Sequence, residues 1–112
     1  MTNPIRRVSV EDAFKSVSTN QDAVMIDVRE PDEIAALAPA VGIVCPMSTI
    51  DPATFDKVNS VRKDQPIYLF CRSGNRSMRV ALALADHGFS NLANVEGGII
   101  AWQASGLPIK KP

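Results

Sequence analysis

The sequence predicts a single α/β domain, with a mainly parallel sheet covered by helices on both faces. Short apolar runs alternate along the chain with stretches of helical periodicity, which is the pattern of repeated strand–helix units. The clearest apolar run, residues 23–28, is continuous rather than alternating, as in a strand that is buried on both sides. A length of 112 residues suits one hydrophobic core, so we expect one domain spanning residues 1–112.

The expected elements follow one another without repeats, low-complexity tracts or obvious linkers. In order, they are a strand at 7–10, a helix at 11–17, a strand at 23–28, a short helix from Pro31, a strand at 41–45, a helix at 52–61, a strand at 66–70, a helix at 77–87, a strand at 92–95 and a helix at 99–104.

Particular residues predict where the first helices begin. Ser9, three residues before Asp12, is a suitable N-terminal cap for the first helix. Pro31 suits the first turn of a helix because no hydrogen bond is lost there. The two carboxylates that follow it face the positive end of the helix dipole.

The helix at 77–87 is expected to be largely buried because its apolar residues recur at i, i+3, i+4 and i+7. The residues of this face are Met78, Ala81, Leu82 and Ala85, widened by Val80 and Leu84. Gly88 is expected to end the helix in the left-handed conformation that glycine adopts readily.

Charge and composition exclude several classes of function. The formal net charge is zero, with 12 basic and 12 acidic side chains, whereas a nucleic-acid-binding protein needs a basic excess. No apolar run approaches the roughly 20 residues that span a bilayer. Residues 1–7 also lack the apolar segment of a secretory signal. We therefore expect a cytoplasmic protein that binds neither nucleic acid nor membranes.

The two cysteines and the single histidine form no metal or disulfide pattern. Cys45 and Cys71 are far apart in sequence, which is a poor disulfide framework for a cytosolic protein. Together with His87 they lack the close pairs of a zinc site, so we expect no metal and no cofactor. Cys45 lies in an apolar run without a polar cluster beside it, and we interpret it as a buried, inert cysteine.

Cys71 is the expected catalytic residue. It directly follows the strand that ends at Phe70, and sites form at the carboxyl ends of parallel strands. The loop after it can surround an anion with backbone N–H groups, and its glycine permits the turn. Such amides, a helix N-terminus and nearby arginines lower a cysteine pKa, so we expect a reactive thiolate. The loop residues are Arg72, Ser73, Gly74, Asn75 and Arg76.

His87 cannot serve as the general base for Cys71. Ten residues of helix from Ser77 place it about 15 Å from the loop, at 1.5 Å per residue. A protease-type cysteine needs an imidazole within hydrogen-bond reach. We interpret His87 as a favourable polar group in the last helical turn. Cys71 must therefore act as a thiolate that is already ionised, and its substrate or product should be anionic.

Three stretches of the sequence resemble the rhodanese family of sulfurtransferases: IDVREPDE at 26–33, CRSGNRS at 71–77, and VEGGIIAW at 95–102 with GLP at 106–108. The resemblance implies a rhodanese-like, five-stranded parallel sheet with helices on both faces. It implies that Cys71 accepts a sulfane sulfur from a small anionic donor such as thiosulfate, forms a persulfide, and passes the sulfur to a thiol or protein acceptor or to cyanide. It also implies that residues 72–76 bind the donor.

Outside the loop, Asp27 and Arg29 match positions that support the site, and we interpret them as a structural pair because buried charges normally occur paired. Trp102 is interpreted as core packing. One segment departs from the family pattern. Where most members have Gly-His-Ile…Gly-Ala, residues 37–42 read Leu-Ala-Pro-Ala-Val-Gly and lack the histidine.

Two alternatives to a sulfurtransferase stay open at this point. A cysteine phosphatase of the related fold has the spacing Cys-x5-Arg, whereas Cys71 and Arg76 give Cys-x4-Arg, and the shorter loop favours sulfur over phosphate. A non-catalytic regulatory or docking module often lacks the cysteine, which this chain retains.

Overall fold

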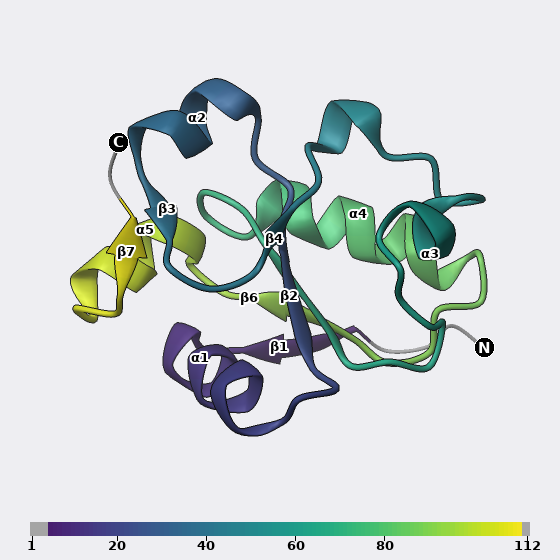
Figure 1. Cartoon of the computed structure of the whole chain (residues 1–112), viewed down its shortest axis with the longest axis horizontal. Helices are drawn as coiled ribbons and strands as arrows, with labels where there is room; N and C mark the ends of the chain where they lie inside the picture. The colour runs from purple at the N-terminus through teal and green to yellow at the C-terminus, as the bar shows by residue number, and fades with distance from the viewer. Residues whose placement is uncertain (1–4, 111–112) are drawn as a thin grey trace.

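Within residues 5–110, five parallel strands form the central sheet, in the order β1–β6–β5–β2–β4 (Figure 1). The strands are β1 (Arg6–Val8), β2 (Val24–Asp27), β4 (Ile43–Val44), β5 (Ile67–Phe70) and β6 (Leu92–Val95). The predicted α/β class and the five-stranded parallel sheet are confirmed.

The computed structural model describes residues 5–110. Residues 1–4, which belong to the segment where no secretory signal is expected, and residues 111–112 lie outside the described part. Within residues 5–110, none of the helices has the length and apolar character needed to cross a membrane.

Each face of the sheet carries its own hydrophobic core because side chains alternate along the strands. In β5, Ile67 and Leu69 belong to one core, and Tyr68 and Phe70 belong to the other. The helices are α1 (Val10–Thr19), α2 (Pro31–Ala36), α3 (Phe55–Val58), α4 (Asn75–Ala85) and α5 (Gly98–Ala104), with a short 3₁₀ helix at Met47–Thr49. Helices α3 and α4 complete the first core, and α1 and α5 complete the second. Figure 1 shows the first pair to the right of the sheet and the second pair to the left.

The predicted starts of the first two helices agree with the structure, whereas the helix expected from Ser77 begins at Asn75. The Ser9 hydroxyl accepts a hydrogen bond of 3.1 Å from the Asp12 amide, at the N-terminus of α1. Helix α2 begins at Pro31. The Glu33 carboxylate accepts a bond of 3.1 Å from the Glu30 amide, which closes the first turn of α2 and holds Glu33 at the start of that helix.

The helix expected at 52–61 is wrong in extent, because only the single turn α3 forms. Before it, the Asp51 side chain accepts a hydrogen bond of 3.0 Å from the Ala53 amide, which favours a turn over a helix. After it, Ser60 has a φ of 54°, outside the helical region. Local side-chain and backbone geometry therefore limits this helix at both ends.

The buried face of α4 is also different from the expected one. It consists of Ser77, Val80, Ala81 and Leu84, whereas Leu82 is 52% exposed. These residues have the expected helical spacing, but the buried face begins at Ser77, and a pattern based on apolar residues does not include a serine. The predicted end is confirmed, because Gly88 follows the helix with a φ of 91°.

A two-stranded antiparallel sheet, β3 (Ala38–Pro39) with β7 (Ile109–Lys110), was not predicted. It attaches the atypical segment 37–42 to the C-terminal part of the chain. Gly42 ends this segment with a φ of 99°, and a Cβ there would lie 2.8 Å from the Met25 carbonyl oxygen. Only glycine therefore fits the approach to β4.

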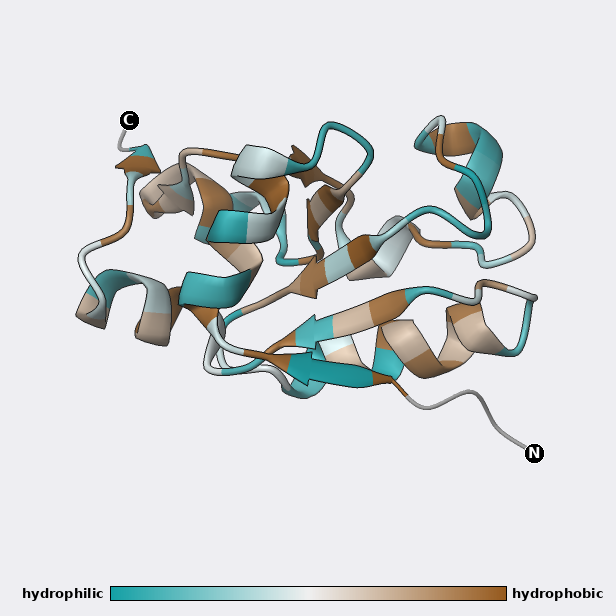
Figure 2. Cartoon of the chain, turned by 90° about the horizontal axis from the view of Figure 1, so that it is seen from below, coloured by the Kyte–Doolittle hydropathy of each residue, from teal (hydrophilic) through white to brown (hydrophobic). Residues whose placement is uncertain are grey.

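The edge strand β1 is hydrophilic at Arg6 and Arg7 (Figure 2). Charged side chains on an edge discourage pairing with other strands. Strands β5 and β6, in contrast, are buried along their whole length.

Candidate active site

Cys71 lies at the carboxyl edge of the sheet, directly after β5. Strand β5 lies between β6 and β2, so the loop that follows β5 has the carboxyl end of a parallel strand on each side. The Cys71 side chain is 1% exposed and is not in a disulfide. The predicted position at the end of a buried strand is therefore present, with the thiol almost wholly out of solvent.

The loop from Cys71 to Gly74 curls so that the chain donates back to the sulfur. The Gly74 amide donates a hydrogen bond of 3.1 Å to Cys71 Sγ, and the Ser77 hydroxyl lies 3.3 Å from the same sulfur. Gly74 precedes α4 with a φ of 105°, which a side chain would strain. The thiol therefore lies inside a turn that depends on the positive φ of Gly74.

Helix α5 supports the loop from its outer side. The Ile99 amide donates to the Cys71 carbonyl oxygen at 3.0 Å, and the Ile100 amide donates to that of Arg72 at 3.3 Å. A Cβ on Gly98 would lie 2.0 Å from the Cys71 carbonyl oxygen. The glycine therefore allows a contact between the two backbones that any side chain would prevent.

Burial raises the pKa of the Cys71 thiol, but hydrogen bonds outweigh it. The Ser77 hydroxyl and the amides of Ser77, Gly74 and Ser73 stabilise the thiolate, and the net pKa lies below the ordinary value of a cysteine. The sequence assigned part of this effect to the loop arginines. In the structure the largest favourable contributions come from neutral donors, with Ser77 first.

Arg76 does not lie free in the loop, because it is held by Glu33 of α2. Its two terminal nitrogens donate to the two carboxylate oxygens at 2.6 and 2.7 Å, in a bidentate ion pair. The hydrogen bond from Arg76 lowers the pKa of Glu33 to about 2 against the opposing effect of burial. That Arg76 binds an anionic donor stays a prediction, and the donor would share the guanidinium with this carboxylate.

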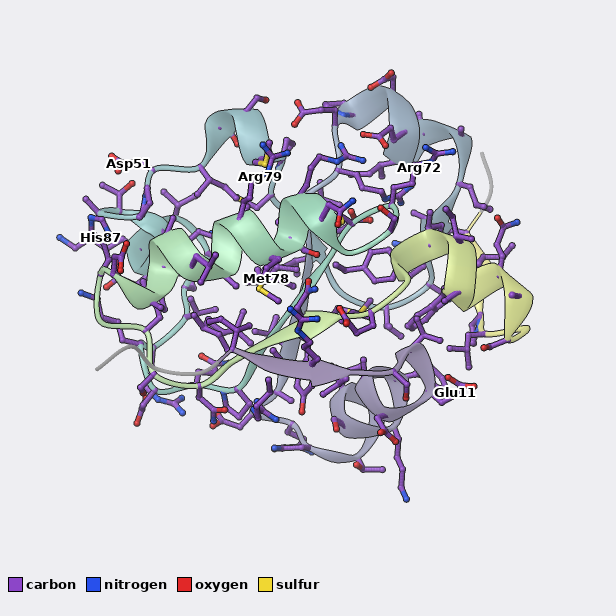
Figure 3. All side chains as sticks on the ribbon, turned by 180° about the vertical axis from the view of Figure 1, so that it is seen from behind. Glu11, Asp51, Arg72, Met78, Arg79 and His87 are labelled. Atoms are coloured by element: carbon purple, nitrogen blue, oxygen red, sulfur yellow. The ribbon has the colours of Figure 1, made fainter. Side chains whose placement is uncertain are left out.

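The other loop side chains face solvent. Arg72, Ser73 and Asn75 are exposed. Arg72 lies at the loop end of α4 in Figure 3, and His87 lies at the opposite end of the same helix. Nδ1 of His87 is 3.1 Å from the Ala83 carbonyl oxygen, which agrees with its expected role in the last helical turn.

Two residues that the sequence reasoning did not assign to the site, Ser77 and Asn94, lie directly behind the sulfur. Both are buried, at 0% and 1% exposure, and their side chains form a hydrogen bond. The Asn94 amide group also donates 3.0 Å to the Gly74 carbonyl oxygen and 2.8 Å to a carboxylate oxygen of Glu96. An asparagine inside the otherwise apolar strand β6 was the available signal, because buried polar side chains need specific partners.

A surface pocket of about 230 Å³ opens beside this cluster. Its lining includes Ser73 and Gly74 of the loop and Asn75 at the start of α4, together with Arg7, Asn94 and Glu96. Arg7 and Glu96 approach each other to 3.7 Å at its rim. The pocket therefore connects the loop to solvent, and charged side chains lie at its rim.

Asp27 and Arg29 form the predicted buried pair. Their charged groups approach to 2.9 Å, and each side chain is less than 5% exposed. Arg29 also donates 2.8 Å to the Leu37 carbonyl oxygen, in the segment that lacks the family's histidine. Trp102 is fully buried, as expected for core packing. The pair therefore holds the backbone of Glu33 and Leu37, within and just after α2, against the end of β2.

Cys45 is 6% exposed, and its sulfur has the Asn59 side-chain amide at 3.6 Å. This agrees with a buried cysteine in the core. Among residues 5–110, no group of three or more histidine, cysteine or acidic side chains could hold a metal ion.

Comparisons with known proteins point to one family. The model of the rhodanese-like domain family matches residues 10–105. A sulfurtransferase of Allochromatium vinosum is 31% identical over 108 residues, which cover 96% of this chain and 97% of the relative. The solved polysulfide-sulfur transferase of Wolinella succinogenes has a TM-score of 0.77 and 29% identity, covering 96% of this chain and 80% of that one. A rhodanese-related protein of Thermoplasma volcanium has a TM-score of 0.73 and 28% identity, covering 94% and 97%.

Proposed function

This chain belongs to the rhodanese-like domain family, and we propose that it is a sulfurtransferase that carries sulfur on Cys71. One observation carries the proposal. The thiol is free, and hydrogen-bond donors hold its pKa below the ordinary value without an adjacent imidazole. A thiolate that is ionised in advance needs no general base, and it is the form of cysteine that attacks sulfur.

In the first half of the proposed reaction, the Cys71 thiolate attacks the outer sulfur of a sulfane donor such as thiosulfate. The bond between the two donor sulfurs breaks, and sulfite leaves with the electron pair. Cys71 then carries a persulfide. The backbone amides of the loop stabilise the negative charge on its outer sulfur, because they are oriented before the reaction begins.

In the second half, a nucleophilic acceptor attacks the outer sulfur of the persulfide. The persulfide bond breaks, and its electron pair returns to Cys71 as a thiolate. A thiol, a protein thiol or cyanide can accept sulfur in this way. No cofactor takes part in either half of the proposed cycle.

Residues 72–76 are the proposed donor-binding loop. Exposed Arg72 is available to attract a small anion, and Arg76 adds positive charge that Glu33 partly neutralises. The Wolinella relative is described as a polysulfide-sulfur transferase, so polysulfide is a second anionic donor to assay beside thiosulfate. The proposed partners are thus a small anionic sulfur donor and a thiol acceptor.

Intact mass spectrometry tests the proposal directly. After incubation with thiosulfate, the parent protein is expected to gain the mass of one sulfur atom and to lose it again with cyanide. Cys71→Ser should gain nothing, whereas Cys45→Ser should behave as the parent does. Sulfur uptake by Cys71→Ser would contradict the assignment of Cys71. No uptake by the parent from thiosulfate or polysulfide would favour a non-catalytic docking module.

A phosphatase assay separates the second enzyme class. Aryl phosphates should be hydrolysed negligibly, because the loop from Cys71 to Arg76 is one residue shorter than the phosphatase loop and its arginine is paired with Glu33. Robust hydrolysis of aryl phosphates by the parent protein would contradict the proposal that it is a sulfurtransferase rather than a phosphatase.

A further inference from the structure

Three buried polar groups lie in a row behind the active-site loop. The Ser77 hydroxyl oxygen is 3.3 Å from Cys71 Sγ and within hydrogen-bond distance of Asn94 Oδ1. All three side chains are at most 1% exposed, so water does not compete for their hydrogen bonds. The arrangement of protons within the row is therefore set by these groups and their protein neighbours.

The orientation of the Asn94 amide is fixed by its other contacts. Its nitrogen donates to the Gly74 carbonyl oxygen at 3.0 Å and to a Glu96 carboxylate oxygen at 2.8 Å. Both are acceptors, so neither can face the amide oxygen. Asn94 Oδ1 must therefore face Ser77, where it can only accept a hydrogen bond.

The Ser77 hydroxyl has one proton and two candidate acceptors. When Cys71 is a thiolate, its sulfur carries the charge and is the stronger acceptor. When the sulfur is a neutral thiol, or the inner sulfur of a persulfide, it is only a weak acceptor. The amide oxygen of Asn94 is then the better partner.

We propose that Asn94 is a positioning residue, which holds the Ser77 hydroxyl proton while Cys71 Sγ is uncharged and yields it when the sulfur becomes a thiolate. Within the sulfur-transfer cycle, this inference rests on the proposed function. When the acceptor attacks the outer sulfur, the persulfide bond breaks and its electron pair moves to Cys71 Sγ. The Ser77 hydroxyl then rotates from Asn94 to the sulfur and stabilises the leaving thiolate, and no proton is transferred.

Asn94 therefore competes with the thiolate, and removing it should favour ionisation. Asn94→Val removes the amide oxygen and leaves no buried group without a partner. The Gly74 carbonyl oxygen keeps the Met78 amide at 3.3 Å, and Glu96 keeps Arg7 at 3.7 Å. Because a neutral hydrogen bond contributes about 0.5–1.5 kcal/mol, the ratio of thiolate to thiol should rise about two- to tenfold at a fixed pH.

Ser77→Ala should act in the opposite direction, because it removes the donor itself. Arg76 of α4 interacts electrostatically with Cys71, and the carboxylates of Glu33 and Glu30 interact with Arg76 in turn. Arg72 follows Cys71 directly in sequence, and Glu96, which pairs with Arg7, contacts Asn94. These groups are present in every variant. Differences among the variants therefore report the hydroxyl and the amide.

The test is a double-mutant cycle in a Cys45→Ser background, with the Cys71 thiolate titrated by ultraviolet absorbance. Asn94→Val should lower the Cys71 pKa, and Ser77→Ala should raise it. In the double variant, Asn94→Val should have no further effect, because its effect on the sulfur passes through the Ser77 hydroxyl. Ser77→Thr should restore much of the effect of Ser77→Ala, since it keeps a hydroxyl.

An unchanged or raised pKa in Asn94→Val would overturn the proposal, and so would an equal shift with and without Ser77. Asn94→Ala, which removes the same oxygen, replaces the valine variant if that protein does not fold. The titration needs no sulfur donor. Failure of the parent protein to take up sulfur would refute the proposed function but would not change the titration of Cys71. Equally, an unaltered pKa in the Asn94 variant would refute the role of Asn94 but would not affect the evidence for sulfur uptake.

Discussion

Replacing Glu33 by glutamine should reveal how much the ion pair with Arg76 stabilises the fold. The pKa of Glu33 is lowered from 4.5 to about 2, chiefly by the hydrogen bond from Arg76, with smaller contributions from the Glu30 amide and from Arg29. At about 1.4 kcal/mol per pKa unit, the full depression would correspond to about 3 kcal/mol. Because the Glu33 side chain is 27% exposed, solvent screening reduces this figure, and we expect a loss of about 1–2 kcal/mol at pH 7.

The expected loss depends on pH in a defined direction. The pKa of Glu33 is lower in the folded than in the unfolded protein, so the stabilisation is fully present above about pH 4.5. It is lost as the pH falls towards 2. About three-fifths of it should remain at pH 3.5 and about two-fifths at pH 3. Glutamine can still accept the hydrogen bond from the Glu30 amide, so the substitution removes the charge and keeps the capping contact of α2.

Urea unfolding measures the effect, followed by the fluorescence of buried Trp102. Parent and Glu33→Gln are compared at pH 7 and at pH 3.5, where the difference between them should have narrowed. Asp32→Asn is the matched control, because it removes an exposed carboxylate from the same helical turn. Equal unfolding free energies at pH 7, or a difference that does not shrink in acid, would refute the assignment of this stability to the ion pair.

Three further outcomes are expected. Arg29→Met should lower the free energy of urea unfolding by about 3–5 kcal/mol, because it leaves its partner carboxylate buried and unpaired, and a loss below about 1 kcal/mol would argue against that pair. Gly98→Ala should lower both stability and sulfur uptake, because its Cβ would overlap the Cys71 carbonyl oxygen, and an unchanged melting temperature would contradict this contact. Arg76→Ala should slow transfer from thiosulfate more than Arg72→Ala does, by about tenfold or more in initial rate, because it removes a partly buried charge and also leaves the Glu33 carboxylate without its partner to repel the anionic donor, and equal losses would count against a role in donor binding.

The predictions that failed did so where features that apolar periodicity does not count decide the structure. The helix expected at 52–61 shortened to one turn because Asp51 forms a side-chain turn before it and Ser60 leaves the helical region after it. Apolar periodicity placed Leu82 in the core, whereas Ser77 occupies the start of the buried face. Serine can replace an apolar residue there because hydrogen bonds satisfy its hydroxyl.

The electrostatics of the site were only partly predictable, because the partners of its polar and charged groups come from distant parts of the sequence. The two loop arginines, Arg72 and Arg76, follow Cys71 closely in sequence, so their positive charge could be counted without a structure. The partners of these arginines could not be identified from the sequence. Arg76 meets Glu33 across a sequence separation of 43 residues, and Ser77 meets Asn94 across 17.

The sequence by itself determined the parallel α/β fold, the place of Cys71 at the end of a buried strand, and the polar, glycine-containing loop that follows it. Each depends on consecutive residues, whose periodicity, glycines and charges act locally. Only the tertiary structure decided that Ser77 and the loop amides, more than the arginines, stabilise the thiolate, and that Arg76 is paired with a carboxylate. The physical reason is that the folding of the sheet brings α2, α4 and β6 together around one sulfur atom, and distances between those elements are not encoded in any one segment.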